Sequence, residues 1–136
     1  MYGEFSNFYK SEITIDGKKF KTTEHYFQAM KYKNNKLHFD KICSTSSPSE
    51  AAALGRTRNV PIRKDWENVK DGIMLKALRA KFTQNEILKN LLLSTGDAIL
   101  VEHTKNDSYW GDGGDDTGLN MLGKLLMQVR SELSDG

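Results

Sequence analysis

The stretch that decides the fold is ITIDGKKFKTTEHYFQAMKYK, residues 13–33, because a turn signal is followed there by a helix signal. Apolar and polar residues alternate on both sides of Asp16–Gly17, and this pair tolerates the positive φ angles of a two-residue turn. The residues after it have helical spacing, and Thr22 or Thr23 is a suitable N-cap. The stretch therefore predicts a β-hairpin that leads directly into an α-helix.

A second helix is predicted at SPSEAAALG, residues 47–55. Ser47 and Glu50 form a capping box, Pro48 suits the first helical position, and Gly55 is typical of a helix end.

Three more helices are predicted further along the chain. One runs from Asp65 to about Phe82, and the next follows a capping box of Thr83 and Glu86 and stops at Gly96. The last helix has an apolar stripe at 3.6-residue spacing, made of Leu119, Leu122, Leu126, Val129 and Leu133. Before it, AILVEH (98–103) predicts a short strand.

Together these elements predict an α+β fold that is mainly helical, with about five helices and a small antiparallel sheet built on the hairpin. The length of 136 residues suits one domain, and no repeat, low-complexity tract or linker divides the chain. We therefore expect a single domain, residues 1–136.

The charge balance argues against a dedicated DNA-binding or membrane-surface protein, since 20 basic and 18 acidic residues give a net charge of +2. Cys43 is the sole cysteine, so no intrachain disulfide can form and a reducing compartment is expected. No apolar run approaches the ~20 residues of a membrane span, and no signal peptide is visible. We expect a cytoplasmic monomer without membrane contact.

Familiar cofactor and metal patterns are missing from the sequence. It contains no phosphate-binding GxxxxGK[ST] motif and no GxGxxG after a strand. The three histidines lack metal-ligand spacing, and GDGGDD lacks the order of a calcium loop. We therefore predict neither a metal nor a cofactor.

Polar residues between aromatics form one candidate contact region near the N-terminus. In EFSNFY (4–9), Ser6 and Asn7 lie between Phe5 and Phe8, which could form a slot for a flat ring. An N-terminal strand with core-facing aromatics explains the same pattern equally well.

The helix after the hairpin carries a second candidate group. Glu24 lies near its N-terminus, where the helix dipole favours a carboxylate, and Gln28 and Lys31 share its face. Ordinary first-turn helix chemistry is the alternative. Arg56 and Lys64 belong to a basic stretch that could bind a phosphate, or could simply be a solvated loop.

The third candidate region is the loop NDSYWGDGGDDTGLN, residues 106–120. Trp110 lies there beside Gly111, and glycines let a backbone approach a ligand closely. Asp107 is a nearby carboxylate, whereas the other three aspartates, Asp112, Asp115 and Asp116, are expected to be solvated loop residues.

These groups suggest a pocket for a flat, polar, anionic ligand that resembles a nucleotide. Cleavage of an N-glycosidic bond places positive charge on the sugar, which a fixed carboxylate can stabilise while another guides or deprotonates water. Glu24 and Asp107 could play these parts without a metal or a cysteine.

Several motifs together resemble the YbiA-like, or NADAR, family. They are FSNFY, ITIDGKKFKTTEHYFQAMKY, ALGR, IMLKALRAKF, and the run from LLLSTGDAILVEHTKNDSYWGDG to GLNMLGKLLMQVR. The resemblance extends from about Gly3 to Leu133, and TEHYFQA combined with DxxWG…GxNxLGxLLM is specific.

The resemblance implies an N-glycosidase. Family members act on phosphoribosyl-aminopyrimidine intermediates of riboflavin synthesis, releasing ribose 5-phosphate, and others are linked to NAD and ADP-ribose or remove ADP-ribose from guanine bases in nucleic acid. By motif, Glu24, Asp107 and Trp110 become the residues expected at the reactive centre. Likewise, the implied ligand contacts are Ser6, Asn7, Arg56 and Asn120.

Other interpretations stay open. A lysine could act covalently, as an amine that attacks C1 of the opened sugar, with Lys31 the first candidate and Lys64 the second. The same pocket could belong to a module that binds NAD or ADP-ribose without turnover. The motif residues could also serve only the fold of a small helical interaction protein. The substrate could be a free nucleotide-like metabolite or ADP-ribosylated nucleic acid.

Overall fold

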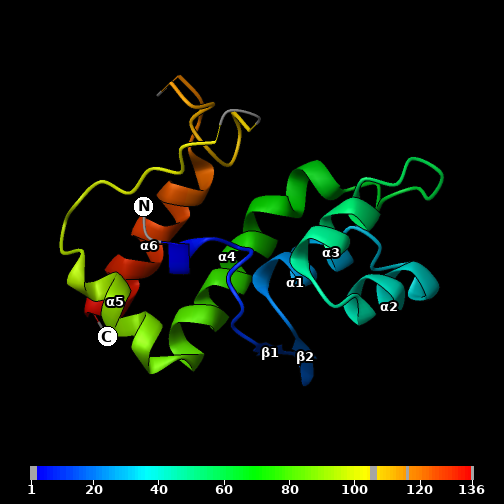
Figure 1. Ribbon diagram of the computed structural model, residues 1–136, viewed down its shortest axis with the longest axis horizontal. Coiled ribbons are helices and arrows are strands. Elements are labelled where there is room, and N and C mark those ends of the chain that lie inside the picture. The colour runs from blue at the N-terminus through cyan, green and yellow to red at the C-terminus, as the bar shows by residue number, and fades with distance from the viewer. Residues whose placement is uncertain (1–2, 105–106, 116, 136) are drawn as a thin grey trace. The chain divides into compact units, whose positions relative to one another are not determined.

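The computed structural model describes residues 3–104, 107–115 and 117–135 (Figure 1). The chain divides into two compact units, residues 6–84 and residues 85–136 together with 1–5. Each unit is described below by itself, and the prediction of a single domain over 1–136 stays a prediction.

The predicted hairpin begins the larger unit. Strands β1 (Ile13–Ile15) and β2 (Lys18–Phe20) pair antiparallel, with Ile13 opposite Phe20. Asp16 and Gly17 have φ angles of 52° and 80°, the left-handed values that a tight two-residue turn requires. Ile13, Ile15 and Phe20 are buried, so the apolar face of the hairpin packs into the core.

Four helices complete this unit. They are α1 (Thr23–Met30), α2 (Lys36–Ser44), α3 (Pro48–Gly55) and α4 (Trp66–Gln84). Helix α1 is central, since it packs against the other three, while β1 packs against α4. Thr22, not Thr23, is the N-cap of α1, and the predicted Ser47 cap of α3 is confirmed.

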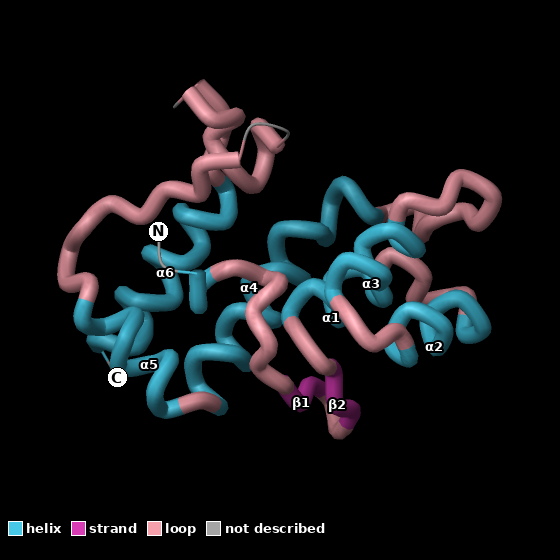
Figure 2. The backbone as a smooth tube through the Cα atoms, in the orientation of Figure 1, coloured by secondary structure: helices cyan, strands magenta, loops and turns pink. Residues whose placement is uncertain are grey.

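The smaller unit contains a 3-10 turn and two helices. The turn η1 (Gly3–Phe5) is followed after residue 84 by α5 (Glu86–Ser94) and α6 (Met121–Asp135), which pack together. A long loop joins α5 to α6 (Figure 2). The apolar stripe predicted for the last helix is largely confirmed, because Leu122, Leu126 and Val129 are buried, whereas Leu119 precedes α6 and is exposed.

The predicted α+β class, mainly helical with one small antiparallel hairpin, is confirmed. The described residues form six α-helices, and the additional one is α2. Its sequence KLHFDKICS buries only His38 and Ile42, so its apolar stripe is too thin to detect by periodicity. In the described part of the chain, no helix is long and apolar enough to cross a bilayer.

The strand predicted at residues 98–103 is wrong, because these residues form an irregular loop. Within the apolar run that suggested a strand, Leu100 is buried and Ile99 is exposed. The carbonyl of Leu100 and the N–H of Glu102 bond to the Asn120 side chain instead of to a neighbouring strand. The alternative reading of residues 4–9 as a strand is also wrong, since they form η1 and turns.

The capping box of Thr83 and Glu86 is wrong as well. Helix α4 continues to Gln84, and the Thr83 hydroxyl donates to the carbonyl of Arg79 within it. Asn85 is the N-cap of α5, because its side-chain oxygen accepts from the N–H of Leu88 at 3.1 Å.

Substitution of Asn85 tests this boundary. Asn85→Ala should lower the free energy of unfolding by about 1 kcal/mol, since it removes an N-cap acceptor. Thr83→Ala is the matched control and should change it less, because its hydroxyl bonds only within α4. Urea unfolding monitored by circular dichroism gives both values, and a larger effect at Thr83 would contradict the assignment.

Candidate functional site

Glu24 is a buried carboxylate in the first turn of α1. The residue is only 8% exposed, and its Oε2 accepts from Nε2 of Gln28 at 2.9 Å, one helical turn later. Its backbone N–H donates to the carbonyl of Asn7 at 3.2 Å. The candidate carboxylate is therefore fixed both by its own helix and by the N-terminal turn.

The turn at residues 6–9 is tied to the same end of α1. Asn7 Oδ1 accepts from the Thr23 hydroxyl at 2.9 Å, and its Nδ2 contacts Met74 Sδ at 3.4 Å. Ser6 Oγ accepts from the N–H of Phe8 at 3.1 Å. Phe8 is 45% exposed whereas Phe5 is fully buried, so of the two predicted slot aromatics only Phe8 presents its ring to solvent.

Lys81, which contacts the turn at residues 6–9, was not predicted from the sequence. Its side chain is almost completely buried, and its Nζ donates to the carbonyl of Ser6 at 2.8 Å. It lies seven residues after Met74 and three after Leu78, both buried, so it shares their helical face. Charged residues are rarely buried without a partner, and the helical spacing of Lys81 from the apolar residues Met74 and Leu78 could have identified it.

Gln28 connects Glu24 to the end of α3. While its Nε2 donates to Glu24, its Oε1 faces Gly55, and a Cβ at Gly55 would lie 1.9 Å from that oxygen. This Oε1 is buried, and no atom of the described residues forms a hydrogen bond with it. Only a glycine at position 55 leaves room for this orientation of Gln28.

Lys31 is half-buried at the C-terminal end of α1. Its Nζ donates to the Gly55 carbonyl at 3.4 Å and lies 5.8 Å from the ring centroids of Phe27 and Trp66. Burial lowers the pKa of the Lys31 ammonium; the charge of Glu24 opposes this shift, and that of Arg56 adds to it. Lys31 is thus electrostatically coupled to two other candidate residues.

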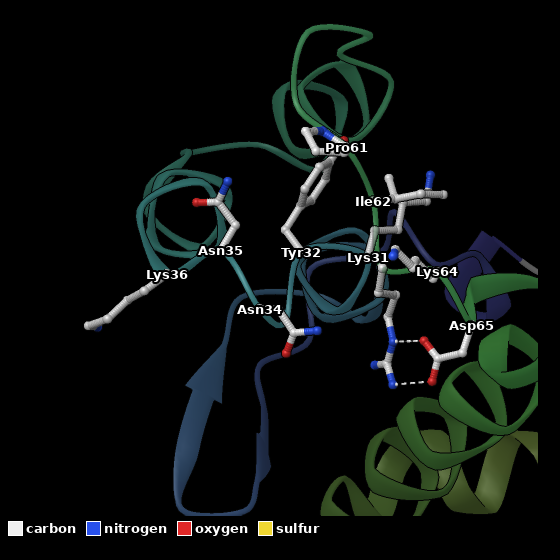
Figure 3. A pocket seen from close by; sticks show the side chains of 10 residues that line it. Lys31, Tyr32, Asn34, Asn35, Lys36, Pro61, Ile62, Lys64 and Asp65 are labelled. Atoms are coloured by element: carbon white, nitrogen blue, oxygen red, sulfur yellow. Dashed lines mark hydrogen bonds and ion pairs between the residues drawn. The ribbon is translucent and has the colours of Figure 1, made fainter.

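A cavity of about 740 Å³ opens beside Lys31 (Figure 3). Its lining residues are Lys31, Tyr32, Asn34, Asn35, Lys36, Pro61, Ile62, Arg63, Lys64 and Asp65. The predicted phosphate contact Lys64 therefore shares a cavity with Lys31, while Arg56 is exposed at the end of α3 and does not line it.

In the smaller unit, Asp107 organises the glycine-rich loop. Its Oδ1 accepts from the N–H groups of Tyr109 at 3.0 Å and Trp110 at 2.8 Å. The rings of Tyr109 and Trp110 meet edge to face, with centroids 5.0 Å apart, and Trp110 is half-buried. One carboxylate oxygen of Asp107 therefore shapes the backbone that presents Trp110.

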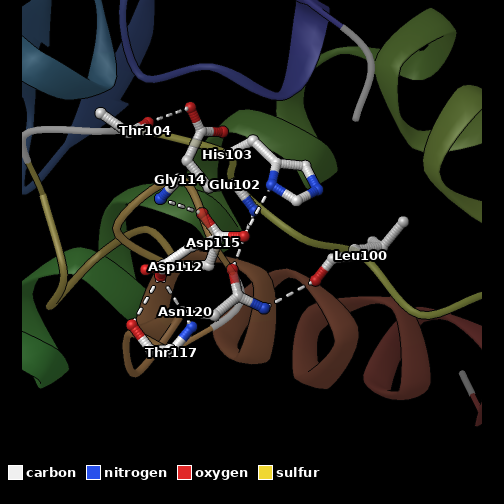
Figure 4. Close-up of polar contacts among 9 residues, drawn as sticks. All are labelled: Leu100, Glu102, His103, Thr104, Asp112, Gly114, Asp115, Thr117 and Asn120. Carbon is white, nitrogen blue, oxygen red and sulfur yellow. Dashed lines mark hydrogen bonds and ion pairs between the residues drawn. The ribbon is translucent and has the colours of Figure 1, made fainter.

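Asn120 and Gly111 also hold this loop together. Both amide atoms of Asn120 bond to backbone, Oδ1 accepting from Glu102 N–H and Nδ2 donating to Leu100 carbonyl, each at 2.9 Å (Figure 4). A Cβ on Gly111 would lie 2.7 Å from the Glu102 carbonyl oxygen. The structure thus gives the predicted ligand contacts Asn120 and Gly111 roles in the loop's own packing.

The expectation that Asp112 is solvated is wrong. Asp112 is 1% exposed, its Oδ2 lies 2.6 Å from Nδ1 of His103, and its Oδ1 accepts from Gly114 N–H at 2.7 Å (Figure 4). Asp115 is exposed as expected, and Asp116 lies outside the described residues. In the part of the chain that the structure describes, no cluster of histidine, cysteine or acidic side chains is arranged to hold a metal ion.

The predicted site residues fall into two groups, one in each unit. The larger unit brings together Glu24, Gln28, Lys31 and the turn that carries Ser6 and Asn7. The smaller unit contains the second group, which is Asp107, Trp110, Gly111 and Asn120.

Substitution of Gly55 should act through Gln28. In Gly55→Ala the new Cβ would overlap Gln28 Oε1, so Gln28 must turn away and release Glu24. We expect the free energy of unfolding to fall by about 1–3 kcal/mol. The cost should shrink in a Gln28→Ala background, which a double-mutant cycle of urea unfolding measures. Equal costs in both backgrounds would exclude this coupling.

The lowered pKa of Lys31 predicts a pH-dependent stability effect. The folded state disfavours the charged ammonium, so its cost is present below the folded-state pKa and disappears as pH rises towards the ordinary value of 10.5. Lys31→Met should therefore be stabilised relative to wild type most near pH 7 and least near pH 10. Thermal unfolding of both proteins between pH 7 and pH 10 measures this difference in stability. A stabilisation by Lys31→Met that grows as pH rises would contradict the prediction.

Comparison with known proteins agrees with the predicted family. The sequence model of the NADAR domain matches residues 1–134. The chain is 54% identical over 133 residues to N-glycosidase YbiA of Escherichia coli K12, covering 98% of this chain and 82% of that protein. It is 44% identical over 134 residues to an N-glycosidase of Nostoc punctiforme, covering 97% and 86%.

A riboflavin biosynthesis protein of Vibrio vulnificus is 40% identical over 134 residues, which cover 98% of this chain and 36% of that protein. The NMR structure of E. coli YbiA superimposes with a TM-score of 0.90 at 53% identity, covering 98% of this chain and 79% of that one. The names of the two N-glycosidases confirm the predicted enzyme class, a hydrolase acting on N-glycosyl bonds. By the family match and these identities, the chain belongs to the NADAR domain family.

Proposed function

We propose that the protein hydrolyses the N-glycosidic bond of a phosphoribosylated or ADP-ribosylated base. The N-glycosidase names of its relatives support the reaction, and the riboflavin biosynthesis protein of V. vulnificus supports a phosphoribosylaminopyrimidine as one substrate class. The observation that carries the proposal is the buried carboxylate of Glu24, fixed by Gln28 at the N-terminus of α1.

The reaction needs stabilisation of positive charge on the sugar. As the bond between C1 of ribose and the base nitrogen breaks, its electron pair leaves with the base and C1 becomes oxocarbenium-like. A water oxygen then bonds to C1, and its proton is passed on while the base nitrogen is protonated. A fixed carboxylate in a largely water-excluded position lowers the energy of the cationic sugar more than a solvated one could.

Glu24 is the carboxylate best placed for this role in the larger unit, because its orientation is set before substrate binds. Phe8, exposed on the turn bonded to α1, offers a ring face to a flat base. Asp107 and Trp110 are proposed as further contacts to water and base, on the basis of the motif in which they occur.

Lys31 offers a second chemical route in the same proposal. In this route the unprotonated amine adds to C1 of the ring-opened sugar, and the bond from C1 to the base nitrogen breaks, with its electron pair and a proton going to the base. Water then hydrolyses the resulting imine, which releases the sugar and restores the amine. Burial favours the unprotonated amine, because it lowers the pKa of Lys31. The bond from Nζ to the Gly55 carbonyl holds the amine beside α3. Trapping with borohydride distinguishes this route, because a covalent imine would leave a sugar adduct on Lys31.

Turnover by Glu24→Gln tests the proposed function. Wild type should release free base from a phosphoribosylaminopyrimidine or from ADP-ribosylated guanosine, as measured by mass spectrometry. Glu24→Gln removes the negative charge with little change of shape, and its rate should fall at least ~100-fold. Glu67→Gln is the matched control, since Glu67 is an exposed carboxylate on α4, and its rate should stay near wild type.

Equal rates for Glu24→Gln and wild type would remove Glu24 from the reaction. If wild type cleaves neither substrate, yet ADP-ribose raises its melting temperature, the protein is a binding module for NAD or ADP-ribose rather than an enzyme.

A further inference from the structure

The cavity beside Lys31 contains more positive charge than its carboxylate neutralises. Asp65 is its one acidic lining residue, and Arg63 binds both of its oxygens, at 2.6 and 3.0 Å. Lys36 pairs with Asp40 at 2.8 Å. Among the described residues, neither Lys31 nor Lys64 forms an ion pair with a carboxylate, so two ammonium groups of the lining remain unneutralised.

Lys31 and Lys64 line the same cavity. Figure 3 shows the side chain of Lys36 extending away from the other lining lysines. The N–H of Arg63 donates to the carbonyl of Lys31 at 2.8 Å, which ties the segment carrying Lys64 to the end of α1.

Lys31 joins this cavity to the candidate reactive centre. It follows Glu24 by seven residues, which corresponds to about 10 Å along a helix axis. Glu24 and Arg56 both influence the charge of Lys31. The positive charge of Arg56 disfavours the charge of Lys31, and an anion bound next to Lys31 would offset that repulsion.

We infer that this cavity binds the phosphate carried by the ribose of the substrate, with Lys31 and Lys64 as its cationic ligands. The inference rests on the proposed function in the form in which Lys31 stays protonated and is not the covalent nucleophile, and it specifies one part of the site. The shared ligand chemistry is a phosphate oxyanion, which is either the 5′-phosphomonoester of a phosphoribosyl group or the diphosphate of ADP-ribose. Lysines suit this task as compact point charges, while the guanidinium of Arg63 is occupied by Asp65.

Binding of inorganic phosphate tests the inference without any turnover. Isothermal titration calorimetry of wild type should show binding, and Lys64→Ala should weaken it about ten-fold, because a hydrogen bond to a charged group is lost. Lys41→Ala is the matched control, since it removes the same charge from an exposed position on α2 outside the cavity lining. Equal affinities in the two variants, or no binding by wild type, would overturn the inference.

Competition experiments identify the source of the phosphate. Ribose 5-phosphate should displace inorganic phosphate if a monoester is recognised, and ADP-ribose should displace it more strongly if the diphosphate is recognised. In either case the Lys64→Ala variant should bind the competitor more weakly than wild type does. Ribose without a phosphate should not displace inorganic phosphate. Competition by ribose equal to that by ribose 5-phosphate would overturn the inference.

The two proposals can fail separately. Glu24→Gln should retain phosphate binding within about two-fold, because the carboxylate is not a ligand of the phosphate. Lysine-dependent phosphate binding without turnover would leave the cavity assignment intact and reject only the proposed reaction. Turnover combined with lysine-independent phosphate affinity would reject only the cavity assignment.

Discussion

The burial of polar side chains in the first turn of α1 is the constraint on which the larger unit depends. Thr23, Glu24 and His25 are consecutive and all buried, and each unbonded polar group there would cost about 1–3 kcal/mol. Partners therefore come from elements far apart in sequence: the Asn7 side chain for Thr23, and the Thr45 carbonyl for Nε2 of His25 at 3.2 Å. Because a carbonyl can only accept, the His25 ring donates through Nε2. Burial lowers the pKa of this ring, which favours its neutral form.

Local signals in the sequence predict much of this fold. The Asp16–Gly17 turn, the cap of α1, the capping box of α3 and the buried stripe of α6 all depend on residues within a few positions of one another. The errors arise where distant residues decide the structure. The segment 98–103 begins with a short apolar run that is typical of a strand, yet Asn120 supplies the bonds that a neighbouring strand would make.

Burial of charge was the least predictable feature of the candidate site, because it depends on what packs around the residue. Asp112 belongs to a run of polar loop residues, but His103 and the N–H of Gly114 allow its burial. Lys81 lies on the buried face of α4 and its ammonium reaches the Ser6 carbonyl. Sequence periodicity could have marked Lys81 as unusual, whereas no local pattern distinguishes Asp112 from Asp115.

Residues that a family motif contains can serve its fold, its chemistry or both, and the bonds that they make help to separate these cases. Both side-chain amide atoms of Asn120 bond to backbone groups of the loop. Its presence in the motif is therefore explained by loop geometry without a ligand. Gln28 differs, because it donates to Glu24 while its Oε1 is buried without a described partner. Lys31 is half-buried, and the charge of Arg56 disfavours its ammonium form in addition to burial. Electrostatic costs of this kind are typical of functional sites, where a ligand offsets them on binding. The energetics therefore direct attention to the cluster of Glu24, Gln28 and Lys31 more strongly than the motif alone.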